Sequence, residues 1–234
     1  MELKKEGYKG YEIYYYSDYY SELGKNIIDK EVEIVENLKV TDRNYVCKIK
    51  YKDKDYILKE PKNEYKKIQR KIMTFFKKGE VLSTLINVNS LKNNKEYFAI
   101  PYLAVVKRKF GMISSSFLVM EVTNENDVTS ESYIKKILKV RYELLENKVY
   151  HGDFNLSNIM LNNGKIKFID TQCKKTLFPK YNLNYDLLSL EESIYREEGI
   201  VNRFGAMDFY KKDLWYYLAY MRKRLKRGKE RVKK

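Results

Sequence analysis

The sequence predicts an α+β protein with a β-rich N-terminal half and a mainly helical C-terminal half. Alternating apolar and β-branched residues run through positions 32–60, a pattern typical of antiparallel strands. From Glu131 onward a helical spacing of apolar residues replaces that alternation. The chain has 234 residues, 44% of them hydrophobic and 34% charged, which is enough for two lobes with sizeable cores.

Most of the N-terminal half reads as strands. They are expected over residues 7–18, as a three-stranded antiparallel meander over 32–60, and over 97–110 and 115–122, with a helical stretch over 21–30. Residues 62–87 carry a helical pattern, which predicts one long helix after the meander. Its apolar face would consist of Ile68, Ile72, Phe75 and Phe76.

The two lobes are expected to meet over Val122–Asp127, where polar residues replace the last strand. We therefore expect an N-terminal lobe over residues 1–122 and a C-terminal lobe over residues 123–234. The C-terminal lobe should be helical except for one hairpin, and no internal repeat is visible in either half.

Composition narrows the classes of partner. The formal net charge of +15 implies a polyanion, which could be nucleic acid, anionic lipid head groups or a phosphorylated substrate. Cys47 and Cys173 lie far apart, and the first residues lack the apolar core of a secretion signal, so we expect reduced thiols in a cytoplasmic protein. One histidine and two dispersed cysteines do not support a zinc site, and no apolar run is long enough to span a membrane.

The segment HGDFNLSNIMLNNGKIKFID, residues 151–170, contains the most informative pattern. Two β-like runs flank an Asn-Gly pair, the strongest short signal for a tight hairpin. That turn pairs Asn162 with Lys165 and places Asn158 opposite Ile169, next to Asp170.

An amide oxygen and a carboxylate therefore meet at the open end of this hairpin, and Asp153 lies on the loop that leads into it. Mg²⁺ prefers oxygen ligands with room for water and substrate phosphates. The alternative is that Asp153 and Asn158 only stabilise a turn, as such residues often do. The hairpin and Asp170 at the required spacing favour a functional site over that alternative.

This pattern resembles the catalytic centre of the protein-kinase-like superfamily, in which an aspartate, four residues, an asparagine and a hairpin precede a second aspartate. The form His-Gly-Asp is that of its small-molecule kinases. The resemblance implies a two-lobed fold, with Asp153 accepting the proton of the acceptor hydroxyl. Asn158 and Asp170 would hold Mg²⁺ against the phosphates of ATP. His151 would support the loop through hydrogen bonds.

The same resemblance implies that Lys59, at the end of the third meander strand, binds the ATP phosphates and pairs with a glutamate on the following helix. Glu80, 21 residues further on, is the favoured partner. Glu64 is the alternative, although it follows Lys59 so closely that we place it in the connecting turn.

Three further residues are assigned by resemblance to the adenine pocket. Met120 would line its back, and Glu121 and Val122 would offer backbone groups to the base. Core packing is the competing explanation for Met120. Asp186 could be a helix N-cap, whereas the resemblance implies that it supports the catalytic loop from below.

Two features depart from the superfamily pattern. The turn TDRN between the first meander strands has no glycine, so the loop that would cover the phosphates does not match the glycine-rich form. Asp170 is followed by Thr-Gln, and only 16 residues separate it from Asp186. That segment is short for docking a peptide, so a protein substrate is not expected.

The whole chain resembles the heptose(II) kinases of the bacterial lipopolysaccharide core. The matching segments are DYILKEPK, KKGE with the apolar helix after it, FLVMEV, residues 151–170 and DLWYYLAYMRKRLKRGK. The resemblance implies ATP-dependent phosphorylation of a heptose hydroxyl on the lipid-linked inner core, at the cytoplasmic face of the inner membrane. No obligate protein partner is inferred.

The C-terminal segment MRKRLKRGKERVKK fits that location, because nine of its 14 residues are basic and such clusters bind anionic head groups. Just before and within it, Leu214, Leu218, Met221 and Leu225 share a helical face. The alternative is a terminal helix packed on the core, with a solvated end.

Two other function classes stay open. One is another kinase of the same fold, acting on a protein or an aminoglycoside. The other is a pseudokinase or nucleic-acid-binding module, which the missing glycines favour and the joint presence of Lys59, Asp153, Asn158 and Asp170 opposes. Nucleic acid is therefore not the expected partner.

Overall fold

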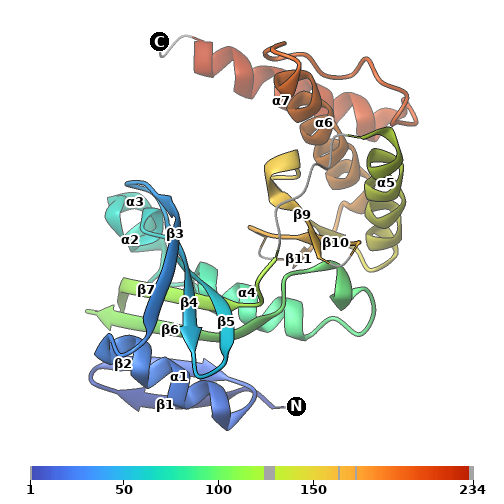
Figure 1. Cartoon of the computed structure of the whole chain (residues 1–234). Coiled ribbons are helices and arrows are strands. Elements are labelled where there is room, and N and C mark those ends of the chain that lie inside the picture. Colours follow the sequence, from blue (N-terminus) through green and yellow to red (C-terminus); the bar gives the residue numbers. More distant parts are fainter. Residues whose placement is uncertain (1, 124–129, 163, 172, 232–234) are drawn as a thin grey trace. The chain divides into compact units, whose positions relative to one another are not determined.

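The computed structural model describes residues 2–123, 130–162, 164–171 and 173–231 (Figure 1). The chain divides into two compact units. The first comprises Met1–Leu91 and Ala99–Val122, and the second comprises Lys92–Phe98 and Thr123–Lys234. Most of the expected lobe boundary, residues 124–127, lies outside the described residues.

A seven-stranded antiparallel sheet forms the N-terminal unit, in the order β1-β2-β6-β7-β5-β4-β3. Its strands are β1 (Lys4–Tyr8), β2 (Tyr11–Tyr15), β3 (Glu33–Val40), β4 (Tyr45–Tyr51), β5 (Lys54–Glu60), β6 (Pro101–Lys109) and β7 (Met112–Met120). The predicted meander is confirmed as β3, β4 and β5. Helix α1 (Asp18–Asp29) packs against β2 and β6, and their apolar side chains form a core around Ile13, Leu23 and Leu103.

The strand predicted over residues 7–18 is present only over Tyr11–Tyr15, as β2, because the chain turns at Lys9 and Gly10 and forms the hairpin β1–β2. Lys9 and Gly10 connect the two strands with φ angles of 46° and 77°. Two consecutive positive φ angles are typical of tight hairpin turns. Lysine rarely adopts such an angle, so the sequence did not mark the turn.

The single long helix predicted over residues 62–87 is also wrong. The segment contains α2 (Asn63–Lys66), α3 (Ile68–Met73) and α4 (Glu80–Asn89). Gly79 precedes α4 with φ 89°, and a Cβ atom there would lie 2.3 Å from Cδ1 of Ile113, so only glycine fits the break. The side chains expected to form a buried face, Ile68, Ile72, Phe75 and Phe76, are all at least half exposed.

The C-terminal unit is mainly helical, as predicted. Its elements are α5 (Glu131–Glu146), β8 (Val149–Tyr150), the 3₁₀ turn Leu156–Asn158, the hairpin β9 (Ile159–Asn162) and β10 (Lys165–Phe168), β11 (Lys174–Lys175), α6 (Pro179–Glu197) and α7 (Leu214–Arg231). The short pair β8–β11 was not predicted, because two residues per strand leave no periodic signal.

Residues 92–98 belong to this second unit because their contacts lie there. The 3₁₀ turn Lys95–Tyr97 places the Tyr97 hydroxyl 2.8 Å from Oε2 of Glu143, to which it donates. Phe98 forms a β-bridge with Phe168, and their rings pack edge to face. The hairpin is thus held by residues that precede β6 in the sequence.

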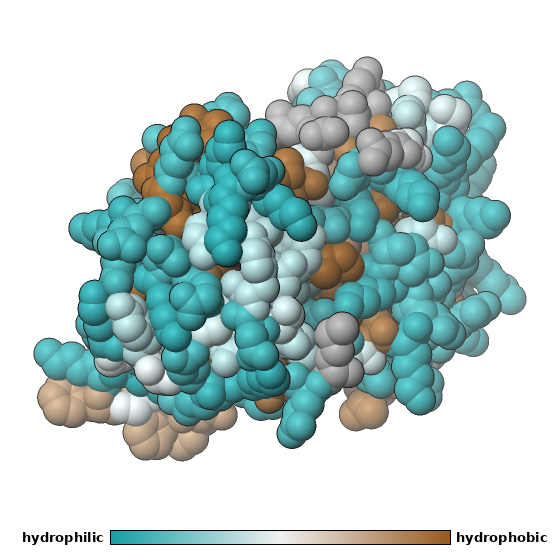
Figure 2. All heavy atoms as spheres, turned by 60° about the horizontal axis from the view of Figure 1, so that its bottom comes forward, coloured by the Kyte–Doolittle hydropathy of each residue, from teal (hydrophilic) through white to brown (hydrophobic). Residues whose placement is uncertain are grey.

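Hydrophilic residues cover most of the surface in view in Figure 2, as the high charged fraction leads one to expect. Among the residues that the structure describes, no helix is both long enough and apolar enough to cross a membrane.

Candidate active site

The hairpin predicted from the Asn-Gly pair is present, with the predicted register. Asn162 pairs with Lys165, and Ile159 pairs with Phe168. The backbone N–H of Ile169 donates to the carbonyl of Asn158 over 3.0 Å, so Asn158 lies opposite Ile169. Asp170 follows with φ 57°, a left-handed conformation that aspartate tolerates better than most residues. Asn163, the first turn residue, lies outside the described part of the chain.

The loop before the hairpin is closed by the side chain of Asn158. Its Nδ2 donates to the carbonyl of Asp153 over 2.8 Å and approaches Oδ2 of that residue at 3.4 Å. Because the amide nitrogen is bonded to the loop, the amide oxygen is directed away from it. Asp153 itself is exposed to solvent.

The donor atoms fit Mg²⁺ better than a transition metal. Asn158 and Asp170 would supply one amide oxygen and one carboxylate, and Mg²⁺ is usually held by one or two such groups together with substrate phosphates. In the described ranges there is no group of three or more histidine, cysteine, aspartate or glutamate side chains that could hold a metal ion.

His151 joins the catalytic loop to the end of the hairpin. Its Nδ1 accepts the N–H of Asp153 at 3.3 Å, so Nε2 carries the proton and donates to the carbonyl of Ile169 at 2.9 Å. Burial lowers the pKa of His151, which keeps the ring neutral. These contacts are those of a supporting residue, as the resemblance implies.

Asp186 lies beneath the same loop. Its Oδ2 accepts the N–H of His151 and its Oδ1 accepts the N–H of Gly152, both over 3.0 Å. The N-cap alternative is wrong, because α6 begins at Pro179 and proline is favoured in the first turn of a helix.

The partner of Asp186 was not predicted from the sequence. Arg141 on α5 donates from Nε to Oδ2 of Asp186 over 3.0 Å, and both side chains are 1% exposed. A signal was present in the spacing, since Arg141 continues the buried helical positions of Ile134 and Ile137. An arginine at such a position requires a buried carboxylate, because an unpaired charge in the interior is costly.

In the N-terminal unit, Lys59 pairs with Glu80, the partner that the spacing favoured. The Nζ atom of Lys59, on β5, lies 3.2 Å from Oε1 of Glu80, in the first turn of α4. Glu64 has a different role, because it accepts the N–H of Glu80 at 2.6 Å and the hydroxyl of Ser116 at 3.3 Å. Burial raises the pKa of Glu64. Glu64 thus caps α4 from a neighbouring segment.

Met120 ends β7, where it is buried and pairs with Ile57 on β5. The backbone N–H of Glu121 donates to the carbonyl of Ile100 over 3.0 Å, so in this arrangement it is not a donor for a nucleotide base. The assignment of Met120, Glu121 and Val122 to the adenine pocket stays a prediction.

The glycine-free turn after β3 is closed on itself. The N–H groups of Arg43 and Asn44 both point to Oγ1 of Thr41, at 3.3 and 3.0 Å. These two donors are therefore engaged within the turn, and a phosphate bound here would have to displace the Thr41 hydroxyl.

Comparisons with known proteins found one curated relative and solved structures, each similar to only a limited degree. No family model matches the chain. A segment of 53 residues is 42% identical to a putative serine/threonine-protein kinase of Acanthamoeba polyphaga mimivirus, and it spans 23% of this chain and only 10% of the viral protein. The kinase domain of Mycobacterium tuberculosis PknI is similar with a TM-score of 0.48 and 12% identity, covering 80% of this chain and 82% of that domain. A cysteine-to-alanine variant of that domain gives a TM-score of 0.46 and 11% identity, covering 70% and 73%.

The elements of each unit are arranged as in protein-kinase-like folds. A lysine on the third meander strand pairs with a glutamate on a following helix, within an antiparallel sheet. In the helical unit, a loop and a hairpin bring an aspartate, an asparagine and a second aspartate into the order typical of kinases. The chain therefore has an α+β, two-lobed, protein-kinase-like fold.

Proposed function

We propose that the protein transfers the γ-phosphoryl group of ATP to a hydroxyl group of an acceptor. The loop and hairpin of residues 151–170 are the observation that supports it most, because Asn158 contacts Asp153 and lies opposite Ile169, the residue before Asp170. Asp153 takes the proton of the hydroxyl while that oxygen forms its bond to the γ-phosphorus and the bond to the β-phosphate oxygen breaks. Bound Mg²⁺, held by Asn158 and Asp170, supplies charge neutralisation at the phosphates.

We infer that the acceptor hydroxyl belongs to a sugar of a lipid-linked glycan, such as an inner-core heptose of lipopolysaccharide. Sequence resemblance supports this, and so does the short distance in sequence from Asp170 to Asp186, which leaves little chain to dock a peptide. A protein acceptor is the second candidate, because the viral relative is named as a serine/threonine-protein kinase. The match covers too little of that protein to carry its substrate over.

The surface of α7 fits a peripheral position at an anionic membrane. Since a helix has about 3.6 residues per turn, the residues of one apolar stripe lie on a single face. The stripe consists of Leu214, Leu218, Met221 and Leu225, which are between 45% and 68% exposed. Arg222 and Arg224 flank it and are exposed. An exposed apolar stripe with basic flanks is typical of helices that lie in a membrane interface.

Mg²⁺-ATP should raise the melting temperature of the protein. A ligand at 100 times its Kd that binds only the folded state stabilises it by about 2.7 kcal/mol, which corresponds to roughly 5–10 °C for a domain of this size. Differential scanning fluorimetry with and without EDTA would measure this, with ADP and AMP as graded controls. An unchanged melting temperature at millimolar Mg²⁺-ATP would favour the pseudokinase alternative.

The substitutions Arg222→Gln and Arg224→Gln together should weaken binding to anionic vesicles about 30-fold, since each basic residue near such a surface contributes about 1 kcal/mol. The remaining binding should fall as salt rises, because the attraction is screened. Sedimentation with vesicles of phosphatidylglycerol and phosphatidylcholine would measure it. The control is Lys136→Gln with Lys139→Gln, two exposed lysines on α5. Equal loss in both variants would show that net charge, and not the α7 surface, governs binding.

A further inference from the structure

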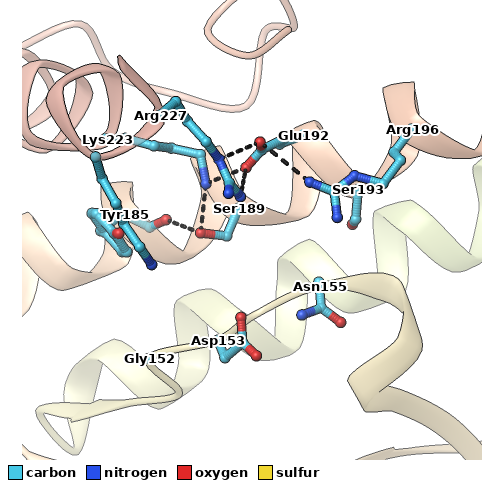
Figure 3. A pocket seen from close by; sticks show the side chains of 11 residues that line it. Gly152, Asp153, Asn155, Tyr185, Ser189, Glu192, Ser193, Arg196, Lys223 and Arg227 are labelled. Atoms are coloured by element: carbon cyan, nitrogen blue, oxygen red, sulfur yellow. Dashed lines mark hydrogen bonds and ion pairs between the residues drawn. The ribbon is translucent and has the colours of Figure 1, made fainter. Parts of the chain in front are cut away.

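A pocket of about 90 Å³ lies next to the proposed base (Figure 3). Asp153 and Asn155 of the catalytic loop form one wall, and α6 and α7 form the other. All of its lining residues belong to the C-terminal unit, so its relation to Asp153 does not depend on the other unit.

Positive charge is in excess in this pocket. Four of its lining side chains are cationic, and only Asp153 and Glu192 are anionic. Three of the cations share the one carboxylate of Glu192: Nζ of Lys223 lies 2.8 Å from it, Nε of Arg227 lies 2.6 Å from it, and a guanidinium nitrogen of Arg196 lies 3.4 Å from it. The fourth cation, Lys226, is exposed at the rim.

The cations are held in place by the surrounding structure. Lys223 is 3% exposed and also donates to Oγ of Ser189 over 3.0 Å. Burial alone would raise the pKa of Glu192, but hydrogen bonds from Arg227 and Lys223 outweigh it and lower that pKa. Glu192 is therefore ionised, and a single negative charge offsets three positive ones.

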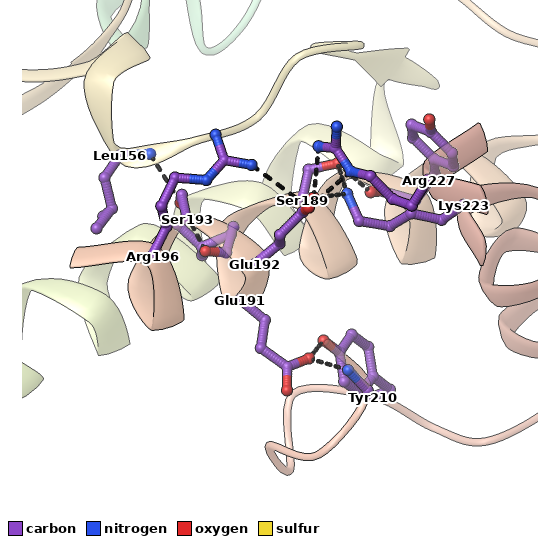
Figure 4. A network of polar contacts seen from close by, with 12 residues as sticks. Leu156, Ser189, Glu191, Glu192, Ser193, Arg196, Tyr210, Lys223 and Arg227 are labelled. Carbon is purple, nitrogen blue, oxygen red and sulfur yellow. Dashed lines mark hydrogen bonds and ion pairs between the residues drawn. The ribbon is translucent and has the colours of Figure 1, made fainter. Parts of the chain in front are cut away.

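The catalytic loop is fixed to this wall (Figure 4). The N–H of Leu156 donates to Oγ of Ser193 over 3.0 Å, and that hydroxyl donates to the carbonyl of Leu190 over 2.6 Å. Glu191, the residue before Glu192, accepts the N–H groups of Gly205 and Ala206 and so binds the segment between α6 and α7 to α6. Hydrogen bonds thus join the loop that carries Asp153 to the charged wall.

We propose that this pocket binds an anionic group of the acceptor, a phosphate or a carboxylate, and thereby holds a neighbouring hydroxyl of the same molecule at Asp153. The proposal rests on the kinase function proposed above. The volume is several times the roughly 10–15 Å³ that one water molecule needs, which leaves room for one small tetrahedral or planar anion. Guanidinium groups, here those of Arg196 and Arg227, are the donors that such anions select.

Phosphate binding tests the pocket without relying on catalysis. In the background Lys59→Met, which removes the lysine predicted to bind nucleotide phosphates, inorganic phosphate and pyrophosphate should still bind, as measured by titration calorimetry. Arg196→Gln with Lys226→Gln should weaken that binding at least tenfold, and both residues are exposed enough to leave the fold intact. The control Lys139→Gln, on α5, should leave it unchanged. No binding in the background variant, or equal binding in the pocket variant, would overturn the proposal.

Turnover then identifies the source of the anion. Glucose is compared with glucose 6-phosphate in solution, and phosphatidylinositol with phosphatidylinositol 4-phosphate in phosphatidylcholine vesicles. We expect the phosphorylated member to be preferred in one arm, through a lower KM that Arg196→Gln with Lys226→Gln abolishes. If the phosphorylated and unphosphorylated compounds of each pair were used with equal kcat/KM, the proposed role of the pocket would be wrong, while the kinase function would stand. If only the pocket variant loses phosphate binding, and no phosphoryl group is transferred to any of these alcohols, the pocket would stand and the kinase function would be contradicted.

Discussion

Asp153→Asn should lower turnover by about 10²–10⁴-fold, the usual loss for a general base, while Mg²⁺-ATP binds almost as tightly as to the wild type. Asp153 lies exposed on the loop, and its backbone carbonyl, not its carboxylate, closes that loop with Asn158 over the shorter contact. Asparagine therefore keeps the loop in place and removes only the group that takes the proton.

Asp170→Asn should behave differently, because it removes the carboxylate that we propose to bind Mg²⁺ at the end of the hairpin. Both nucleotide affinity and turnover should fall. Titration calorimetry with Mg²⁺-ATP on the two variants, beside initial rates of phosphoryl transfer, separates the two roles. Asp208→Asn, an exposed aspartate of the same unit, is the control for the loss of one negative charge. Full turnover in Asp153→Asn would disprove the kinase assignment of this loop.

Asp186→Asn should reduce the free energy of unfolding by about 3–5 kcal/mol. Arg141 and Asp186 are both 1% exposed, and removing one charge leaves the other buried without its counter-ion. The N–H groups of His151 and Gly152 lose a charged acceptor at the same time, so the loop that holds Asp153 loses its support. Urea unfolding followed by circular dichroism would measure the loss.

A second substitution distinguishes the buried charge from other effects. Arg141→Met added to Asp186→Asn should make the protein more stable than Asp186→Asn alone, because the unpaired guanidinium is gone. Glu131→Gln breaks the exposed pair with Lys135 on α5 and should leave the unfolding midpoint close to that of the wild type. A double variant less stable than Asp186→Asn would show that packing of Arg141, and not its charge, accounts for the effect.

The parts of the site that the sequence predicts are those fixed by local geometry. The register of β9 and β10 follows from one tight turn, so the sequence alone is sufficient to place Asn158 opposite Ile169, the residue before Asp170. The pair of Lys59 and Glu80 was expected from the resemblance, which implies a lysine on the third meander strand and a glutamate on the following helix. The prediction of one long helix was wrong because Lys67 and Gly79 have non-helical backbone angles. These angles depend on tertiary packing, which the periodicity of the sequence does not show.

The charged pocket could not be predicted for a related reason. Its walls come from the catalytic loop, the middle of α6 and the second half of α7, which are brought together only by tertiary packing. In the sequence, Lys223 looks the same as its neighbours Arg222 and Arg224, although one is buried and the others are exposed. The three residues point to different sides of α7. Which side faces α6 is known only once the two helices have been placed against each other.

The sheet order has a consequence for how the chain folds. Tyr14 on β2 pairs with Ala104 on β6, so this edge of the sheet closes only after most of the N-terminal unit has been synthesised. Closing so long a loop costs more entropy and is slower than closing a hairpin. The segment 151–170, by contrast, contains its own turn and ladder. We expect the hairpin β9–β10 to form early, with the association of β2 and β6 setting the overall rate.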